Sequence, residues 1–377
     1  TEIDPVSGAL FARNPYNTEF ADRIAFFTVN TPNRTVTGNR TEFIGRNNSL
    51  KNPAAMSRTH LSNRVGAGYD PCGAIHVPFT LANGQEKEIR FMLGTAGRRS
   101  ADASQYIHRY RSAEASELVL HQVRRYWEKT LSAVRVKTPD TSLDMLANGW
   151  LMYQTIACRL FARAGLYQCG GGYGFRDQLQ DVGALISTSP VLAREQILRC
   201  CAHQFEEGDV QHWWHPEGTD RPERGVRTRI TDDLLWVPYT VSCWTEVWGL
   251  DGLLEEPVSY LRSPVLAKEE LERYERPERS ERFESVYQHC TRAMECVLAR
   301  GVGEHGLCRM GTGDWNDGMN HIGAQGWGES VWLTWFFGLV LERWGAVAGR
   351  CGDREAAERY QRLSKHFVQQ AEGAWDG

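Results

Sequence analysis

The sequence contains 377 residues, of which 41% are hydrophobic and 24% are charged, and it carries a formal net charge of -4 at pH 7. This composition is typical of a globular protein with one large or two ordinary domains, and it argues against extensive disorder. Because the charge provides no basic field, neither nucleic acid nor an anionic membrane surface is expected as a partner.

Cysteine usage and hydropathy indicate the cellular compartment. The ten cysteines are scattered without a CxxC pair, so neither a zinc ribbon nor a small disulfide scaffold is indicated, and we expect a reducing compartment, the cytoplasm. The longest strongly apolar run, Val331 to Leu341, is too short to span a bilayer, so no membrane insertion is expected of this segment. The chain starts at Thr1 and ends at Gly377 directly after a helical pattern, and we therefore expect a piece of a longer protein.

Residues 1–102 carry strand patterns and are predicted to form a partial antiparallel β-sandwich. Apolar residues alternate over 75–81 and again over 89–93, and Asn83-Gly84 between them predicts a hairpin turn. Pro78 in the first arm favours an edge strand, because proline cannot donate to a ladder. Further strands are expected over residues 23–29 and 35–44.

The rest of the chain has helical periodicity. Residues 103–140 are predicted to be a helical linker, with a helix over 103–134, and residues 141–377 a toroid of helical hairpins. Its expected helices cover residues 141–165, 191–207, 231–248, 281–300, 328–347 and 353–371. The loops between them are long and rich in Gly, Trp, His and Asp, and such loops usually carry function.

The loop of residues 311–320 is the first candidate site. It presents Asp314, Trp315, Asn316 and Asp317 between glycines. An indole face beside carboxylates and an amide suits a sugar ring, whose C–H face stacks on the indole while its hydroxyls bond to the polar groups. The alternative is a turn or helix N-cap, which Asp-rich glycine loops also form. A calcium loop counted from Asp314 lacks the required glycine and glutamate.

A second loop, residues 170–181, delivers Arg176, Asp177 and Asp181 after a glycine run. If a helix begins near Asp177, the two carboxylates lie one turn apart on one face and can bind neighbouring sugar hydroxyls, with Arg176 as a forked donor. A surface ion pair together with an N-cap explains the same residues.

A third loop contains His212, Trp213 and His215, and Asp232 and Asp233 follow it. The histidines lack a third ligand at recognisable spacing, so no metal site is predicted and Trp213 is interpreted as part of a polar and aromatic substrate wall. The two aspartates can also simply cap the helix that begins there.

A carboxylic acid that gives a proton to a leaving oxygen beside an aromatic wall is the general acid of glycosidic bond cleavage, and we assign this role to Asp317. An inverting hydrolase also needs a second carboxylate as the base for water. A phosphorylase does not, because phosphate is itself a charged nucleophile.

Four motifs, YGFRDQLQD at 173–181, QHWWHP at 211–216, TRITDDLLW at 228–236 and GDWNDGMN at 313–320, together resemble glycoside hydrolase family 94. The resemblance implies a β-sandwich joined by linker helices to an (α/α)6 barrel, and inverting phosphorolysis with inorganic phosphate as co-substrate and no cofactor. It implies that Asp317 is the general acid and that Trp315, Arg176, Asp177 and Asp181 hold the transferred glucosyl unit. Residues 9–17, 41–46 and 65–72 look most like the branch acting on β-1,2-glucan.

The sequence departs from the family in its length. Family members continue well beyond the general acid and take their phosphate-binding residues from that later part, so we expect this chain to lack the phosphate pocket, to form an open barrel and to be weak or inactive alone. Expected partners are a β-glucan oligosaccharide, phosphate or glucose 1-phosphate, and a second copy in a homodimer. Two alternatives remain open: an inverting hydrolase with Asp233 as base, and a non-catalytic glucan-binding or length-control region of a cyclic β-1,2-glucan synthase at the inner membrane.

Overall fold

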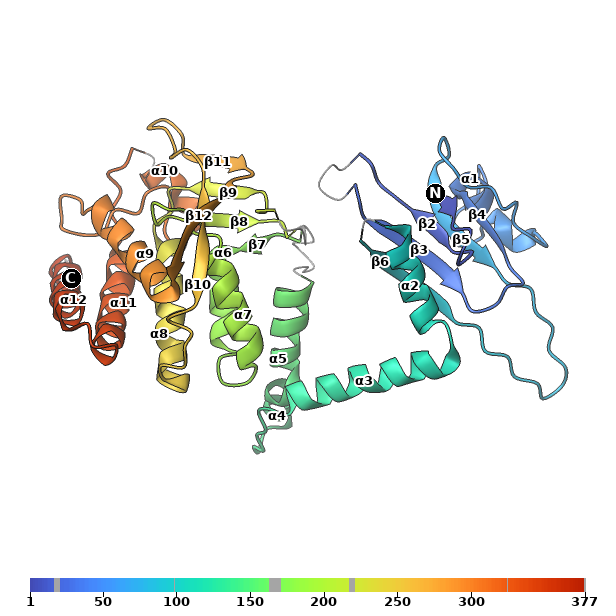
Figure 1. Ribbon diagram of the computed structural model, residues 1–377, viewed down its shortest axis with the longest axis horizontal. Helices are drawn as coiled ribbons and strands as arrows, with labels where there is room; N and C mark the ends of the chain where they lie inside the picture. Colours follow the sequence, from blue (N-terminus) through green and yellow to red (C-terminus); the bar gives the residue numbers. More distant parts are fainter. Residues whose placement is uncertain (17–20, 98, 163–170, 217–220, 324, 376–377) are drawn as a thin grey trace. The chain divides into compact units, whose positions relative to one another are not determined.

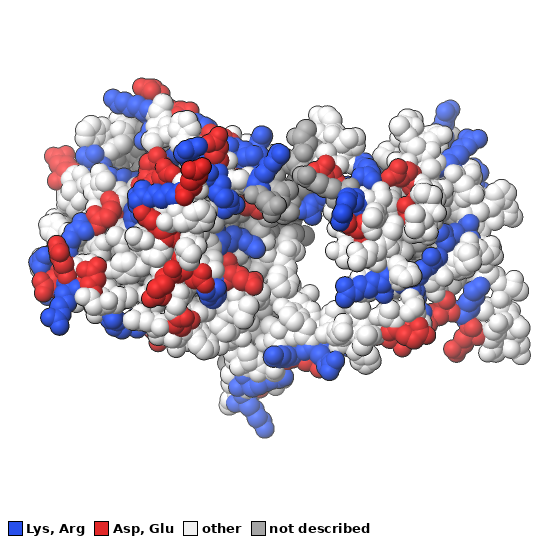
Figure 2. All heavy atoms as spheres, viewed as in Figure 1, with Lys and Arg blue, Asp and Glu red and all other residues white. Residues whose placement is uncertain are grey.

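The computed structural model describes residues 1–377 except 17–20, 98, 163–170, 217–220, 324 and 376–377. The chain forms two compact units, Thr1–Glu128 and Lys129–Gly377 (Figure 1). On the face of the second unit that Figure 2 shows, acidic and basic side chains are intermingled.

The first unit is built on antiparallel sheets, as the strand patterns predict. A four-stranded sheet has the order β1-β2-β3-β6, with β1 at Glu2–Ile3, β2 at Leu10–Ala12, β3 at Ile24–Val29 and β6 at Phe91–Ala96. A second sheet pairs β4, Thr35–Asn39, with β5, Pro71–His76. Short helical segments follow at α1, Arg40–Ile44, and in a 3₁₀ turn at Ala54–Ser57.

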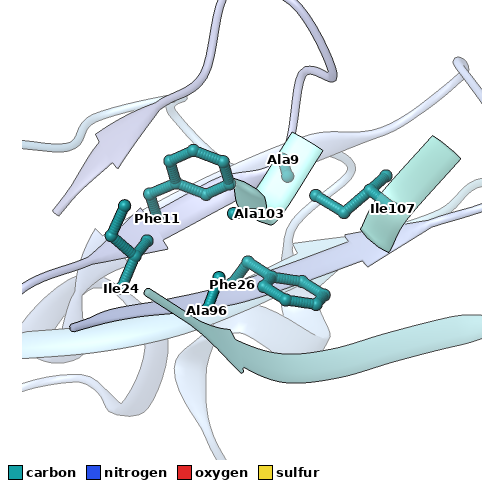
Figure 3. Packing of buried hydrophobic residues seen from close by; sticks show 7 residues of the cluster. All are labelled: Ala9, Phe11, Ile24, Phe26, Ala96, Ala103 and Ile107. Carbon is teal, nitrogen blue, oxygen red and sulfur yellow. The ribbon is translucent and has the colours of Figure 1, made fainter. Parts of the chain in front are cut away.

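One face of the four-stranded sheet is covered by helix α2, Ser100–Tyr110. The buried side chains Phe11, Phe26 and Ile107 meet there (Figure 3). Gly94 on β6 leaves room for this packing. A Cβ at position 94 would lie 2.5 Å from the ring of Phe26, which is too close unless the ring shifts. The core of this unit therefore depends on an aromatic ring packed directly over the neighbouring strand's backbone.

The predicted hairpin over residues 75–93 is wrong. β5 ends at His76 and pairs with β4, whereas β6 begins at Phe91 and pairs with β3. Asn83-Gly84 does lie in a turn, closed by the Gln85 amide donating to the Ala82 carbonyl at 3.0 Å, but within a connection rather than between paired strands. Two other predictions need correction: the strand expected over 35–44 gives way to α1 at Arg40, and the helix expected over 103–134 is two helices, α2 and α3, Ala113–Leu131.

Helices dominate the second unit. They are α4 Thr141–Met145, α5 Leu151–Gln154, α6 Phe175–Gly183, α7 Pro190–Cys201, α8 Trp236–Trp248, α9 Val286–Arg300, α10 Asn320–Gly323, α11 Val331–Arg350 and α12 Arg354–Gly373. Two π-helical stretches, Leu146–Trp150 and Thr155–Phe161, flank α5, and residues 163–165 of the helix predicted there lie outside the described residues. Asp232–Leu235 and Asp317–Met319 form 3₁₀ turns.

The second unit also contains strands that the helical patterns did not predict. A sheet of order β11-β9-β8-β7 joins β7 Tyr173–Gly174, β8 Gln211–Trp214, β9 Gly225–Thr228 and β11 Glu272–Glu275, and it lies at one end of the helices (Figure 1). β10, Pro257–Arg262, pairs with β12, Glu278–Ser285, so the helix predicted over 281–300 starts only at Val286.

The expected toroid of helices is not confirmed. Helix α11 packs along α12 and against α8, with Leu341 and Trp344 fully buried. Its exposed residues Trp332 and Trp335 leave an apolar stripe that the rest of the described chain does not cover. The first unit is thus an antiparallel sandwich-type domain and the second a helical domain with small sheets at one end.

Candidate active site

The loop of residues 311–320 is shaped by its own side chains. Asp314 Oδ1 accepts from the Asn316 amide at 2.9 Å, and Asp314 Oδ2 accepts from Ser330 Oγ at 2.6 Å. Asn316 Oδ1 accepts from the Gly318 amide at 3.0 Å and caps the 3₁₀ turn that begins at Asp317. Asp314 and Asn316 therefore act in the loop as the turn-forming alternative predicts, and they hold Trp315 and Asp317 at its tip.

Arg176 connects this loop to two other segments of the unit. Its buried guanidinium donates to Asp232 Oδ1 at 3.0 Å, to the Asp314 carbonyl at 2.9 Å and to Asp317 Oδ1. Arg176 lies in the first turn of α6 and Asp232 opens the 3₁₀ turn before α8. The forked donor expected from the sequence thus binds carboxylates of the protein itself.

A line of acidic and basic groups ends at Asp317. The buried Asp233 Oδ2 accepts a hydrogen bond from His212 Nδ1 at 2.7 Å. On the other side of the imidazole ring, His212 Nε2 lies 3.9 Å from Asp317 Oδ2. The Asp317 side chain is 57% exposed, in contrast to its neighbours Arg176 and Asp233. Asp317 is therefore the one acid of this line that a solute can reach directly.

The buried charges shift the pKa values of this line. Burial lowers the pKa of His212, but the charge and hydrogen bond of Asp233, with Asp317 adding to them, outweigh burial and raise it to about 9. Burial and the charge of Asp233 raise the pKa of Asp232, against the lowering effect of Arg176. At neutral pH His212 is thus a cation beside Asp317.

A cavity of about 170 Å³ opens next to this line. It is lined by Trp315 of the loop, by Arg176, Asp177, Gln180 and Asp181 of α6, and by Arg159. As predicted, Asp177 and Asp181 lie one turn apart on one face, and both face Arg159, at 3.6 Å and 2.9 Å. Trp315 is half exposed and its Nε1 donates to Gln180 Oε1 at 3.4 Å.

Two residues of this cavity were missed by the sequence analysis. Gln180 stands inside the motif of residues 173–181, so its position could have been noticed. Arg159 comes from a π-helical stretch with no motif of its own, and only the fold brings it to α6.

Trp213 and the histidines of its loop do not line this cavity. The Trp213 ring packs at 5.5 Å from Tyr274 and at 5.1 Å from His215, while His212 faces Asp233. Within the described ranges, no group of three or more His, Cys, Asp and Glu side chains is arranged to hold a metal ion.

Comparison with known proteins assigns the fold to a family. The model of the glycosyl hydrolase 94 superfamily catalytic domain matches residues 126–377, and that of the glycosyl hydrolase 94 supersandwich domain matches residues 1–113. The chain belongs to glycosyl hydrolase family 94. Both the resemblance seen in the motifs and the antiparallel N-terminal domain are thereby confirmed.

Relatives within family 94 include a synthase and several phosphorylases. The chain is 36% identical over 381 residues to the cyclic β-(1,2)-glucan synthase NdvB of Rhizobium meliloti, covering 100% of the chain and 13% of the synthase. It is 24% identical over 386 residues to N,N'-diacetylchitobiose phosphorylase of Vibrio furnissii, covering 96% of the chain and 45% of that enzyme. It is 26% identical over 336 residues to 3-O-β-D-glucopyranosyl-β-D-glucuronide phosphorylase of Paenibacillus borealis, covering 89% of the chain and 40% of that enzyme.

The chain therefore spans less than half the length of these family 94 relatives. In the part of the chain that the structure describes, no helix combines the length and the apolar character needed to cross a membrane.

Proposed function

We propose that this chain carries the general acid and glucosyl-binding groups of an inverting phosphorolysis of β-glucosides, with β-1,2-glucooligosaccharides as substrates and α-glucose 1-phosphate as product. The observation that supports it is the exposed carboxyl of Asp317 beside a small cavity walled by an indole and carboxylates. The phosphorylases among the relatives, which act on glycosides by name, agree with this reaction class.

The cavity suits one sugar ring. At about 170 Å³ it is smaller than the ~300–1,000 Å³ of pockets for drug-sized ligands. Trp315 offers a face for the C–H side of the ring, and Asp177, Gln180 and Asp181 offer acceptors and a donor for hydroxyls. In this proposal Trp213, Asp233, Asp314 and Asn316 act indirectly, by packing or by holding the groups that touch the sugar.

The bond changes follow from these positions. Asp317 gives its proton to the glycosidic oxygen as the C1–O bond breaks, and a phosphate oxygen attacks C1 from the opposite face, so a β-glucoside yields an α-phosphate. Asp317 is left as a carboxylate. Arg176 and the His212 cation lie beside it and stabilise that product form of the acid.

We infer that a bound sugar hydroxyl takes over one donor of Arg176, whose guanidinium contacts Asp317 in the free protein. Phosphate is the only co-substrate in this scheme, and no cofactor enters it.

Three expectations about the whole protein stay predictions: a homodimer, a cytoplasmic location and membership of a larger inner-membrane synthase.

Asp233 is poorly suited to the alternative role of hydrolytic base. Its side chain is 1% exposed and its Oδ2 is engaged by His212, so it has no access to an attacking water without rearrangement. The second candidate function, a non-catalytic glucan-binding or length-control region of a cyclic glucan synthase, is favoured by the match of the whole chain to NdvB.

The test is an assay of glucose 1-phosphate and free glucose with β-1,2-glucooligosaccharides or cellobiose, with and without phosphate, on this chain and on a longer chain that extends beyond Gly377. Phosphate-dependent glucose 1-phosphate that disappears in Asp317→Asn supports the proposal. Glucose release without phosphate points to a hydrolase. Glucan binding without turnover in either chain supports the non-catalytic role.

A further inference from the structure

A second, larger cavity lies apart from the sugar cavity in the same unit. It measures about 700 Å³ and shares no lining residue with the cavity at Trp315. Its walls come from the ends of β9 and α9, from the segment after β10, and from Gly311, Thr312 and Trp327 on either side of α10. Nothing in the proposed phosphorolysis uses it.

The lining carries an excess of positive charge. Five basic residues and three acidic residues face the cavity, and two of the acids, Glu207 and Asp209, both bind Arg227 at 2.9 Å and 2.7 Å. Arg229 donates to the carbonyls of Leu266 and Ala267. These carbonyl contacts fix the side chain of Arg229 without neutralising its charge.

Arg300 and Arg309 converge on the same backbone. Arg300 Nη1 donates to the carbonyls of Arg229 and Ile230 and to Thr231 Oγ1, and that hydroxyl donates in turn to the Arg309 carbonyl. The contacts bring three guanidinium-bearing segments to one wall of the cavity. Like charges held together this way are stabilised when an anion lies between them.

Two cations of the lining, Arg309 and Lys268, have no acidic partner within the described part of the chain. Among the described residues neither forms an ion pair, and the buried Nε of Arg309 has no hydrogen-bond acceptor. The Arg309 guanidinium instead lies 5.2 Å from the centre of the Trp327 ring, and Trp327 is 70% exposed. An exposed indole, a guanidinium near its face and the side chain of Lys268 thus line the same cavity.

We propose that this cavity binds a phosphorylated sugar. The free cations of Arg309 and Lys268 suit the phosphate, because charge-assisted hydrogen bonds to phosphate are the strong ones. The exposed Trp327 ring suits the C–H face of the sugar. The volume lies within the range of pockets that enclose such ligands.

The backbone would couple this cavity to the loop of residues 311–320. Gly311 and Thr312, which line the cavity, begin the loop of residues 311–320 that carries Asp317, and a Cβ at Gly311 would lie 1.8 Å from the Arg229 carbonyl oxygen. The loop therefore rests directly on the wall of this cavity. The proposal does not depend on the phosphorolysis, since the two cavities use different side chains.

Isothermal titration of the chain with α-glucose 1-phosphate, inorganic phosphate and glucose tests the proposal. The titrations are made in an Asp181→Asn background, so that binding in the cavity at Trp315 is weakened. We expect glucose 1-phosphate to bind more tightly than phosphate or glucose. Arg309→Gln and Lys268→Gln should each weaken it about tenfold, and Trp327→Ala should weaken glucose 1-phosphate but not phosphate.

Arg262→Gln is the matched control, because Arg262 is an exposed arginine on β10 that does not line the cavity. It should leave all three affinities unchanged. Unchanged binding in Arg309→Gln, or loss of all binding in the Asp181→Asn background, would overturn the proposal. Glucose binding as tightly as glucose 1-phosphate would also overturn it, because the cations would then have no role. A negative result in these titrations leaves the proposed phosphorolysis untouched, because the glucose 1-phosphate assay with Asp317→Asn tests it separately.

Discussion

Replacing Arg176 by glutamine should destabilise the second unit strongly. The guanidinium is 7% exposed, and its partner Asp232 is fully buried. Removal of one partner leaves a buried carboxylate without its cation, which costs about 3–5 kcal/mol. The contact with exposed Asp317 adds only about 0–1 kcal/mol because water screens it. We therefore expect Arg176→Gln to lower the free energy of unfolding by about 3–5 kcal/mol.

Urea unfolding followed by tryptophan fluorescence measures this change. Arg343→Gln is the control, because Arg343 forms a 3.0 Å pair with exposed Glu246 and its loss should cost about 0–1 kcal/mol. The double variant Arg176→Gln/Asp232→Asn should recover much of the loss, since it replaces the stranded charge by a neutral amide. If Arg176→Gln costs no more than Arg343→Gln, or if the second substitution restores nothing, Asp232 is not held by Arg176 in the way described.

Three further outcomes are expected. In a longer chain that extends beyond Gly377, Asp317→Asn should reduce glucose 1-phosphate formation by about 10²–10⁴-fold while glucan binding persists, and an unchanged rate would remove Asp317 from the role of acid. Against the lowering effect of burial, the charge and hydrogen bond of Asp233 raise the pKa of His212 to about 9. The stability that protonated His212 contributes should therefore be complete below pH 6.5 and lost as the pH rises through 9. His212→Gln should flatten that part of the pH–stability curve, and a curve identical to that of the unchanged chain would contradict the pairing of His212 with Asp233. Gly94→Ala should cost the first unit about 1–3 kcal/mol by overpacking Phe26, as thermal unfolding would show.

Most long helices could be predicted from the sequence because their signals are local. Asp353 caps α12, and Ser285 and Gln288 form a capping box at the start of α9, a local signal that the expected start at residue 281 missed. The short strands β7, β8, β9 and β11 could not be predicted. They have no clear alternation and exist because the fold brings their backbones together.

The hairpin error has the same origin. Alternation over 75–81 and 89–93 and a good turn between them are compatible with two strands that pair to each other or to other partners. The partners of β5 and β6 are set by the sheets around them, and the proline at 78 ends the first arm early.

The candidate site was accessible from the sequence where its residues share a motif. Asp177 and Asp181 were expected on one helical face, and the structure has them so. The contacts among Arg176, Asp232 and Asp317 join three separate motifs, and no spacing rule predicts which carboxylate an arginine will bind. The roles of these residues in binding a sugar or moving a proton stay predictions.

The contacts of Arg176 have a consequence for folding. Its bonds reach 56 residues along the chain to Asp232 and 138 residues to the carbonyl of Asp314. Contacts of such sequence separation require the closure of long loops, so they form late relative to the helices themselves. The circular dichroism signal of the helices can therefore return on refolding before the loop of residues 311–320 has bound Arg176. Recovery of glucan binding would then report the last step of folding in this unit, which circular dichroism alone does not detect.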